Sequence, residues 1–314
     1  MHSRTLSVTL CRTALGAAEA MATPTAIKTV AAIFPPSMRS TGFGLANAVA
    51  SAGAIFAPIL IPIIAIPFGW RGTFVAAGVV GAIWTAAWLL ITRKIKFDDA
   101  VSQSPVADTD GHHTIFRNRQ TWTIAGAKVL SDATWWLMLF WMPDFLHRQF
   151  GVSGVALGPP LALAYVGAAV GSLASGGIAT WFLGRGYSVN RVRKLVLLGS
   201  AMLVLPLPLA PHAPNYWVAA LILAFVLAAH QGFSTNLFAL ITDIVPKKKI
   251  GRVTSFGAFC GNVGGVAITK VAGAVLAAGL GYLPLFAFAS VSYLLALGWI
   301  QLMVPRIVPQ DEAA

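Results

Sequence analysis

Two charged residues, an arginine and a glutamate, lie inside one apolar run near the start of the sequence. Arg12 and Glu19 fall within the run from Leu6 to Phe34, which is long enough to span a bilayer as a helix. Their spacing corresponds to about 700° of helical rotation and about 10 Å of rise, so both would face one side. A guanidinium can bind a carboxylate, and a buried carboxyl group can gain and lose a proton. Because ionisable groups in a span face a bundle interior or a water-filled cavity, this face predicts an anion pathway.

A second pair of charges lies in the middle of the sequence. Lys128 and Asp132 are four residues apart and would share one face of a helix. One interpretation is an ion pair inside the membrane that neutralises itself and fixes helix packing. The other leaves Lys128 as a second cationic contact for an anion. A further lysine, Lys270, lies deep in another apolar run, and we expect its long side chain to reach the interface.

Polar residues that could bind a ligand also lie within two later apolar runs. His230 is followed by residues with amide or hydroxyl groups, namely Gln231, Ser234 and Asn236. Such groups suit a ligand with several hydroxyls, although a lone buried histidine is often structural. Asn262 stands between Gly261 and Gly264, which allow close helix approach. This asparagine either bridges two helices or contacts the ligand.

The composition places these residues in a membrane protein. Of 314 residues, 57% are hydrophobic and 10% are charged, whereas a soluble domain carries about 25% charged residues. The net charge of +12 indicates basic residues gathered on the cytoplasmic side rather than nucleic-acid binding. Cys11 and Cys260 both fall in apolar runs, and no motif suggests a metal, a cofactor or a catalytic group. A membrane enzyme is therefore disfavoured.

The apolar runs predict nine membrane-spanning helices, each bounded by glycine, proline or charge. We expect them at residues 8–33, 43–66, 74–92, 122–146, 158–183, 195–212, 217–244, 253–277 and 283–304. Several tryptophans, Trp135 and Trp136 among them, are assigned to span ends. The longest connection, 93–121, contains aspartate, serine and proline residues and predicts a soluble linker. The fold class is therefore all-α, a polytopic transmembrane bundle.

Lysine and arginine residues are distributed unevenly between the connections. Fifteen lie in the segments 34–42, 93–121, 184–194, 246–252 and the C-terminal tail, and three lie in the alternate segments. Because basic residues favour the cytoplasmic side, the C-terminus is expected in the cytoplasm and, with nine spans, the N-terminus outside. The basic residues after the fifth span are assigned to a cytoplasmic cluster in contact with anionic lipid: Arg185, Arg191, Arg193 and Lys194.

The chain contains an internal repeat with an offset of about 212 residues. Matching positions are Phe34-Pro35 with Val245-Pro246, and Gly69 with Gly281. The repeat places His230 at the position equivalent to Glu19. Two halves of six spans related in this way build one large class of transporters. Because the first three spans correspond to spans seven to nine, three helices are expected to precede Met1, which leaves nine of twelve.

Five stretches carry motifs that can be compared with a known family. They are Arg12 to Glu19 with Pro24, Phe34-Pro35-Pro36-Ser37-Met38-Arg39, Lys128-Val129-Leu130-Ser131-Asp132, Phe140-Trp141-Met142-Pro143 and His230-Gln231-Gly232-Phe233-Ser234-Thr235-Asn236. These motifs resemble the anion:cation symporter family of the major facilitator superfamily, and within it the bacterial hexuronate transporters. The resemblance implies proton-coupled symport of a sugar acid by alternating access. It implies that Arg12 binds the substrate carboxylate, that Glu19 carries the proton, and that residues 230–236 and Asn262 contact sugar hydroxyls.

The expected organisation has four parts. They are the remainder of an N-terminal half (1–92), a cytoplasmic linker (93–121), a six-helix C-terminal half (122–305) and a cytoplasmic tail (306–314). The expected partners are a sugar acid, protons and the lipid of the inner membrane, for a monomer without cofactor, metal or nucleic acid. Two alternatives stay open. The chain is a non-functional remnant of such a transporter, or it carries another organic anion such as a hexonate or an aldarate.

Overall fold

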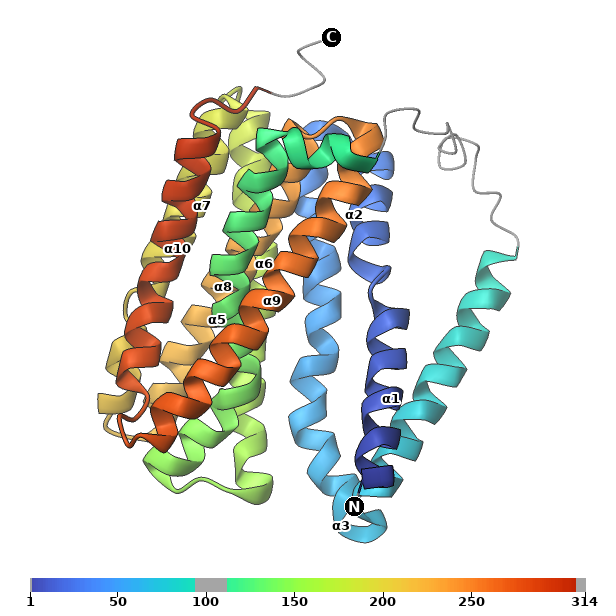
Figure 1. Cartoon of the computed structure of the whole chain (residues 1–314), viewed down its shortest axis with the longest axis vertical. Helices are drawn as coiled ribbons and strands as arrows, with labels where there is room; N and C mark the ends of the chain where they lie inside the picture. The colour runs from blue at the N-terminus through green and yellow to red at the C-terminus, as the bar shows by residue number, and fades with distance from the viewer. Residues whose placement is uncertain (1, 94–111, 309–314) are drawn as a thin grey trace.

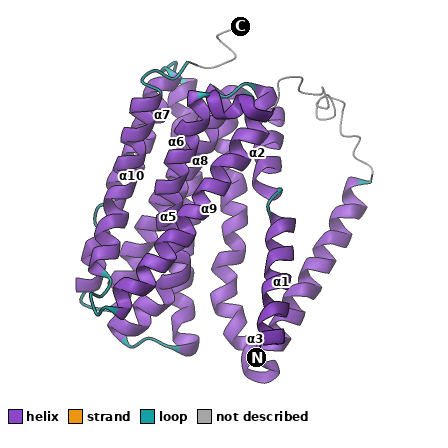
Figure 2. Cartoon of the chain, viewed as in Figure 1, coloured by secondary structure: helices purple, strands orange, loops and turns teal. Residues whose placement is uncertain are grey.

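The computed structural model describes residues 2–93 and 112–308, which form a bundle of helices (Figures 1 and 2). No strand is present in this described part of the chain. Six of its helical segments are long and apolar enough to cross a membrane. The prediction of an all-α transmembrane bundle is therefore confirmed. The predicted linker 93–121 lies largely outside the described residues, as does most of the predicted tail 306–314.

The helices follow the predicted spans closely. The α-helices are α1 (His2–Glu19), α2 (Ala22–Ile33), α3 (Arg39–Thr92), α5 (Arg119–Phe150), α6 (Gly158–Gly184), α7 (Val189–Val204), α8 (Tyr216–Ile244), α9 (Ile250–Ala277) and α10 (Leu283–Met303). Short 3₁₀ helices lie between them: η1 (Pro36–Met38), η2 (His112–Arg117), η3 (Gly154–Leu157), η4 (Leu207–His212) and η5 (Lys247–Lys249). Helix α1 begins at the end of the bundle opposite to the one where α10 ends (Figure 1).

Three predicted regions differ from the helices of the structure, and proline or glycine lies at each break. The predicted span 195–212 is divided at Pro206 into the end of α7 and η4. The predicted span 8–33 is divided into α1 and α2 by a turn just before Pro24. Because proline has no backbone N–H, it cannot continue the hydrogen bonding of α1, but it is tolerated in the first turn of α2. The predicted spans 43–66 and 74–92 both belong to α3, which folds back at Gly69 (Figure 1). Gly69 has φ 64° and ψ 178°, a conformation that favours glycine.

The internal repeat is visible in the backbone. Phe34 and Val245 both leave their helices in extended conformation, with φ/ψ of −94°/135° and −104°/129°. A proline and a 3₁₀ turn follow at both places, before α3 and α9 begin. Gly69 and Gly281 also match, since both have positive φ, 64° and 68°. Equivalent positions of the two segments therefore take the same local geometry.

Burial is concentrated in the C-terminal part of the bundle, which comprises α5 to α10. Most residues of α8 are buried, and this helix lies among α5, α6 and α7 (Figure 1). By contrast, most described side chains of α1 and α3, in the N-terminal part that comprises α1 to α3, are exposed. Large apolar residues such as Ile66, Phe74 and Trp84 of α3 are more than 60% exposed. Apolar side chains on the outside of a bundle suit a lipid environment.

Helix α6 packs between the two parts through residues with short side chains. A Cβ atom at Gly171 would overlap the backbone of Ala228 in α8. Farther along α6, a Cβ atom at Gly176 would overlap the backbone of Ser40 in α3. Glycine at both positions therefore lets α6 approach α8 and α3 at backbone distance.

Hydroxyl groups add hydrogen bonds to the contact between α3 and α6. The Ser172 hydroxyl donates to the carbonyl oxygen of Gly44. The hydroxyl oxygens of Thr41 and Thr180 are 2.7 Å apart, a distance at which either can donate. These bonds fix the position of α6 along α3, and so join the N-terminal part to the C-terminal part.

Candidate functional site

Buried polar side chains gather where α5, α8 and α10 meet; we call them the polar cluster (Lys128, Ser131, Asp132, His230 and Tyr293). On α5, Lys128 Nζ is 2.7 Å from Asp132 Oδ2, and the two side chains are only 11% and 13% exposed. The Lys128 ammonium also lies 5.4 Å from the centre of the Phe238 ring of α8. Because the two charges lie one turn apart on one helix, the ion pair forms within α5. The structure therefore places a buried cation in the cluster, held by a local carboxylate.

His230 connects α8 to both neighbouring helices. Its Nδ1 lies 2.6 Å from Tyr293 Oη of α10, and its ring stacks on Trp135 of α5 with centroids 4.8 Å apart. The Tyr293 hydroxyl also donates to the carbonyl oxygen of Ser131, over 3.2 Å. Because this hydroxyl has a single proton, Nδ1 of His230 must be the donor to Tyr293 whenever Ser131 is the acceptor. Nε2 is then left as the acceptor nitrogen of the ring.

The amide and hydroxyl groups that follow His230 lie on a largely buried stretch of α8. Ser234 and Asn236 are buried, and Gln231 is half-buried. Asn236 Nδ2 donates to the carbonyl oxygen of Gly232 over 3.0 Å, while its Oδ1 is buried without a hydrogen-bond partner in the described part of the chain. This stretch of α8 therefore offers an unused acceptor close to the polar cluster in sequence.

The same stretch of α8 is linked to the N-terminal part. Thr235 Oγ1 accepts a hydrogen bond from Asn47 Nδ2 of α3, over 3.1 Å. Sequence reasoning did not single out Asn47. An asparagine within an apolar span needs a hydrogen-bond partner on another helix, and this requirement was the feature of the sequence that could have identified Asn47.

Glu19 and Asn262, two further residues predicted for the site, lie apart from the polar cluster. Glu19 is the last residue of α1 and is exposed. Arg12 lies on the same helix, but its side chain is outside the described part of the structure. Asn262 is exposed on α9. Among the described residues, no hydrogen bond or ion pair joins Glu19 or Asn262 to the cluster.

Trp135 and Tyr293 are members of this region that sequence reasoning missed. The assignment of Trp135 to a span end was wrong, because it lies near the middle of α5 and stacks on His230. Tyr293 is buried within the apolar helix α10. A tyrosine hydroxyl buried among apolar residues requires a polar partner, and that was the only sequence signal for it.

A buried ion pair and a serine join α7, α8 and α3; we call them the arginine cluster (Arg193, Asp243 and Ser40). Arg193 is fully buried, and its Nε lies 2.7 Å from Asp243 Oδ2. A second guanidinium nitrogen donates to the hydroxyl of Ser40 in α3. The prediction that Arg193 belongs to a basic cluster in contact with lipid was therefore wrong. Its position at the start of α7 turns it into the bundle, towards Asp243.

Comparisons with known proteins agree with this architecture. The family model described as "Major Facilitator Superfamily" matches residues 1–269. The chain is 27% identical over 305 residues to the "Hexuronate transporter" of Escherichia coli (strain K12), covering 91% of this chain and 70% of that protein. It is 24% identical over 315 residues to the "D-galactonate transporter" of Escherichia coli O6:H1, covering 93% and 73%.

Solved structures show the same fold at lower identity. The E. coli fucose:proton symporter aligns with a TM-score of 0.63 and 17% identity, covering 92% of this chain and 74% of that one. A bacterial homologue of the iron transporter ferroportin in an outward-facing state aligns with a TM-score of 0.64 and 14% identity, covering 88% and 66%. The chain thus spans about two thirds to three quarters of the length of these relatives and structures.

Proposed function

Because the chain belongs to the Major Facilitator Superfamily, we propose that it carries a sugar acid such as a hexuronate across the inner membrane, by alternating access and together with protons. The family and the relatives are transporters and not enzymes. The names of the relatives, hexuronate and galactonate transporters, support a sugar acid as substrate. The proposed orientation has the C-terminus in the cytoplasm, as the distribution of basic residues favours.

The single observation that supports this function best is the buried cation of the polar cluster. Lys128 lies in an apolar bundle, and its ammonium is held only by Asp132 and the face of Phe238 among the contacts described above. A substrate carboxylate entering the bundle would compete with Asp132 for this ammonium. Exchange between two carboxylates keeps the charge of Lys128 compensated before, during and after binding, which avoids the cost of an unpaired charge.

The polar groups around Lys128 suit the remainder of a sugar acid. Nε2 of His230 and Oδ1 of Asn236 are acceptors, and the hydroxyl of Ser234 can donate or accept. The ring of Trp135, beside His230, adds a flat apolar surface. The assignment of Arg12 to the substrate carboxylate and of Glu19 to the proton stays part of this proposal, and rests on the resemblance and on their shared helix face.

Uptake into proteoliposomes tests the proposal directly. We expect the purified chain to take up glucuronate or galacturonate faster than galactonate or galactarate, and to accumulate it only when a pH gradient is imposed. Uptake without dependence on the gradient would contradict proton coupling but leave transport standing. No uptake of any of the four acids would contradict the function itself.

The Lys128→Gln variant tests the role of the polar cluster. A hydrogen bond to a charged group is worth about 1.5–3 kcal/mol, so uptake at low substrate concentration should fall at least about tenfold. Lys270→Gln is the matched control, because it removes an exposed lysine of α9 from the same chain. Equal uptake by the two variants would show that Lys128 does not contact the substrate.

A further inference from the structure

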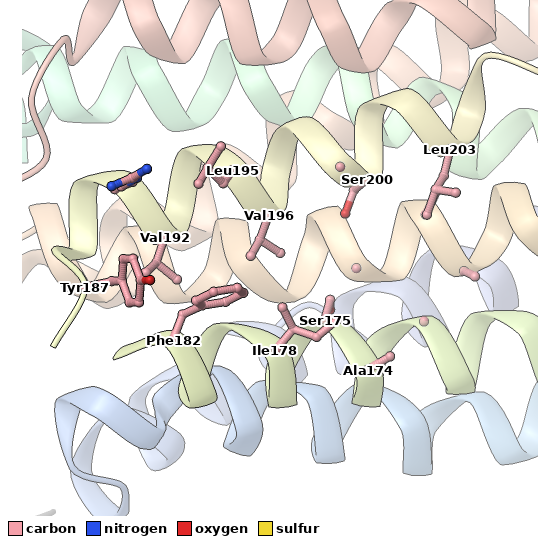
Figure 3. Close-up of a pocket in the computed structure, with 16 residues that line it drawn as sticks. Ala174, Ser175, Ile178, Phe182, Tyr187, Val192, Leu195, Val196, Ser200 and Leu203 are labelled. Carbon is pink, nitrogen blue, oxygen red and sulfur yellow. The ribbon is translucent and has the colours of Figure 1, made fainter. Parts of the chain in front are cut away.

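An apolar groove of about 670 Å³ runs between α6, α7 and α8 (Figure 3). Tyr187 lies at one end of it and Leu203 at the other, and Ser175 and Ser200 face it from α6 and α7 (Figure 3). Apart from Arg191 at one end, its other walls are glycine, alanine, valine, leucine, isoleucine and phenylalanine. Rim residues such as Leu195 and Leu203 are half exposed, 55% and 50%, so the groove opens on the side of the bundle.

Basic and aromatic residues mark one end of the groove. Arg191 lines it, with its guanidinium carbon 5.7 Å from the centre of the Tyr187 ring. Arg185 lies close by in sequence, with its guanidinium carbon 3.4 Å from the centre of the Trp181 ring. None of the described residues that line the groove is acidic. This end lies where α6 ends and α7 begins, on the same side of the bundle as the end of α10 (Figure 1).

The length of the groove matches one leaflet of a bilayer. Arg191 and Leu203 both line it and both lie on α7, twelve residues apart. At 1.5 Å per residue this is about 18 Å. The hydrocarbon core of a bilayer is about 30 Å thick, so each leaflet contributes about 15 Å. A chain that fills the groove from the arginine end would therefore stop near the bilayer midplane.

A second apolar depression, of about 420 Å³, lies beside the first. It shares Ile178 and Phe182 of α6 with the groove and is also lined by Trp181, over which Arg185 lies. Ile178 and Phe182 are four residues apart, so they form one ridge along the helix between the two depressions. The depression covers only Gly177 to Phe182 of α6, about 8 Å of helix, and lies at the arginine end of the groove. It can therefore hold the first part of a second acyl chain beside the groove, under the same anionic headgroup.

We propose that α6, α7 and α8 bind an anionic diacyl phospholipid, with one acyl chain in the groove, the other in the depression beside it, and the phosphate between Arg185 and Arg191. Aromatic residues at this end, Trp181 and Tyr187, lie where headgroups meet the hydrocarbon region. The lipid site is separate from the polar cluster of α5, α8 and α10, so it does not depend on the identity of the transported acid.

Native mass spectrometry of the delipidated protein tests this site with two probes that carry identical acyl chains, phosphatidylglycerol and phosphatidylcholine. Each basic residue near the membrane surface contributes roughly a factor of five to the attraction of anionic lipid. With two arginines, we therefore expect phosphatidylglycerol to bind about 25-fold more tightly to the wild-type chain. The double variant Arg185→Gln/Arg191→Gln should reduce it to the level of phosphatidylcholine. Arg306→Gln, at the same end of the bundle, is the charge control and should change nothing.

The acyl channel is tested separately by filling it. A Cβ atom at Gly199, which lines the groove, meets no other atom within 4 Å, so a leucine at this position can extend into the groove. Gly298→Leu of α10 is the matched control, because Gly298 is also exposed and also has no atom within 4 Å of an added Cβ. Phosphatidylglycerol binding should be lost in Gly199→Leu and kept in Gly298→Leu, with equal melting temperatures for both.

Three results would overturn the proposal. The first is binding by Gly199→Leu that equals the wild type. The second is an unchanged preference for phosphatidylglycerol in the double arginine variant. The third is complete competition by glycerol 3-phosphate, which would reduce the site to a phosphate site without acyl chains. None of these results depends on whether the chain transports a sugar acid.

Discussion

Two buried ion pairs in this chain have the same nitrogen–oxygen distance, but one lies within a single helix and the other joins two helices. Lys128 and Asp132 lie on one helix, 2.7 Å apart, and keep 11% and 13% of their side-chain surface exposed. Arg193 and Asp243 lie on two helices, also 2.7 Å apart, and keep 0% and 5%. The first pair forms whenever α5 forms, whereas the second forms only when α7 and α8 pack. The first can therefore exchange partners without disturbing the bundle, and the second cannot.

The two cations also differ in the geometry of their hydrogen-bond donors. A lysine ammonium is a single charge on a flexible stem, while a guanidinium presents several donors in a fixed plane. The Lys128 ammonium contacts one carboxylate on its own helix. The Arg193 guanidinium of α7 contacts both Asp243 of α8 and Ser40 of α3, and so connects three helices. A cation with a single carboxylate partner suits a ligand site, and a guanidinium with partners on several helices suits structural support. Breaking each pair should therefore affect different measurements.

The largest effect on stability is expected for Asp243→Asn. This change leaves the fully buried Arg193 without its counter-charge, which costs about 3–5 kcal/mol. The free energy of unfolding in mixed micelles of increasing dodecyl sulfate content measures the loss. The double variant Arg193→Met/Asp243→Leu removes both charges and should recover most of the stability. If Asp243→Asn lowered the free energy of unfolding no more than Asp132→Asn does, the two ion pairs would not differ in their contribution to stability.

A smaller effect is expected for Ser40→Ala. Ser40 is buried and accepts a hydrogen bond from the Arg193 guanidinium, and bonds to charged groups contribute about 1.5–3 kcal/mol. The same unfolding measurement should show a loss in this range. Because Ser40 is the α3 member of the arginine cluster, its loss should not add to that of Asp243→Asn. Full additivity of the two changes would mean that they act at independent sites.

The smallest effect on stability, and the clearest on transport, is expected for Asp132→Asn. Its pair lies within one helix and joins no second helix, so the free energy of unfolding should fall less than it does for Asp243→Asn or Ser40→Ala. Without Asp132, the Lys128 ammonium has no competitor for a substrate carboxylate. Uptake should then show a lower KM together with a lower kcat, because release is slowed. A raised KM would place Asp132 itself in contact with the substrate.

Local features of this chain were predictable from its sequence. The apolar runs located the membrane spans, and proline and glycine marked their ends, as at Pro35 and Gly69. The internal repeat reappears as matching backbone geometry after α2 and α8. The spacing of Lys128 and Asp132 also placed them on one face, because four residues are one helical turn. Each of these properties depends on residues that are close in sequence or related by one offset.

Contacts between distant helices were not predictable in the same way. Arg193 and Asp243 are 50 residues apart, and Ser40 is 153 residues from Arg193. His230 and Tyr293 are 63 residues apart. Local sequence patterns place each residue on a helix. They do not determine which helices pack together or how each helix is rotated about its axis. Arg193 was therefore assigned to a basic surface cluster, although the packing of α7 against α8 buries it.

The glycine contacts of α6 have a mechanical consequence. Helices that interlock through large side chains must separate before they can shift along each other, because each side chain sits in a hollow of the neighbour. Where α6 meets α3 near Gly176, backbone lies directly against backbone and no space is left for a Cβ atom. A shift of one turn would bring Ser172 or Thr180 to the place of Gly176, and the Cβ atom of either would overlap the backbone of Ser40. The hydrogen bonds of Thr41 and Ser172 across the same contact would break as well. The two parts are therefore held in a single register, and they can move relative to one another by tilting at this contact rather than by sliding along it.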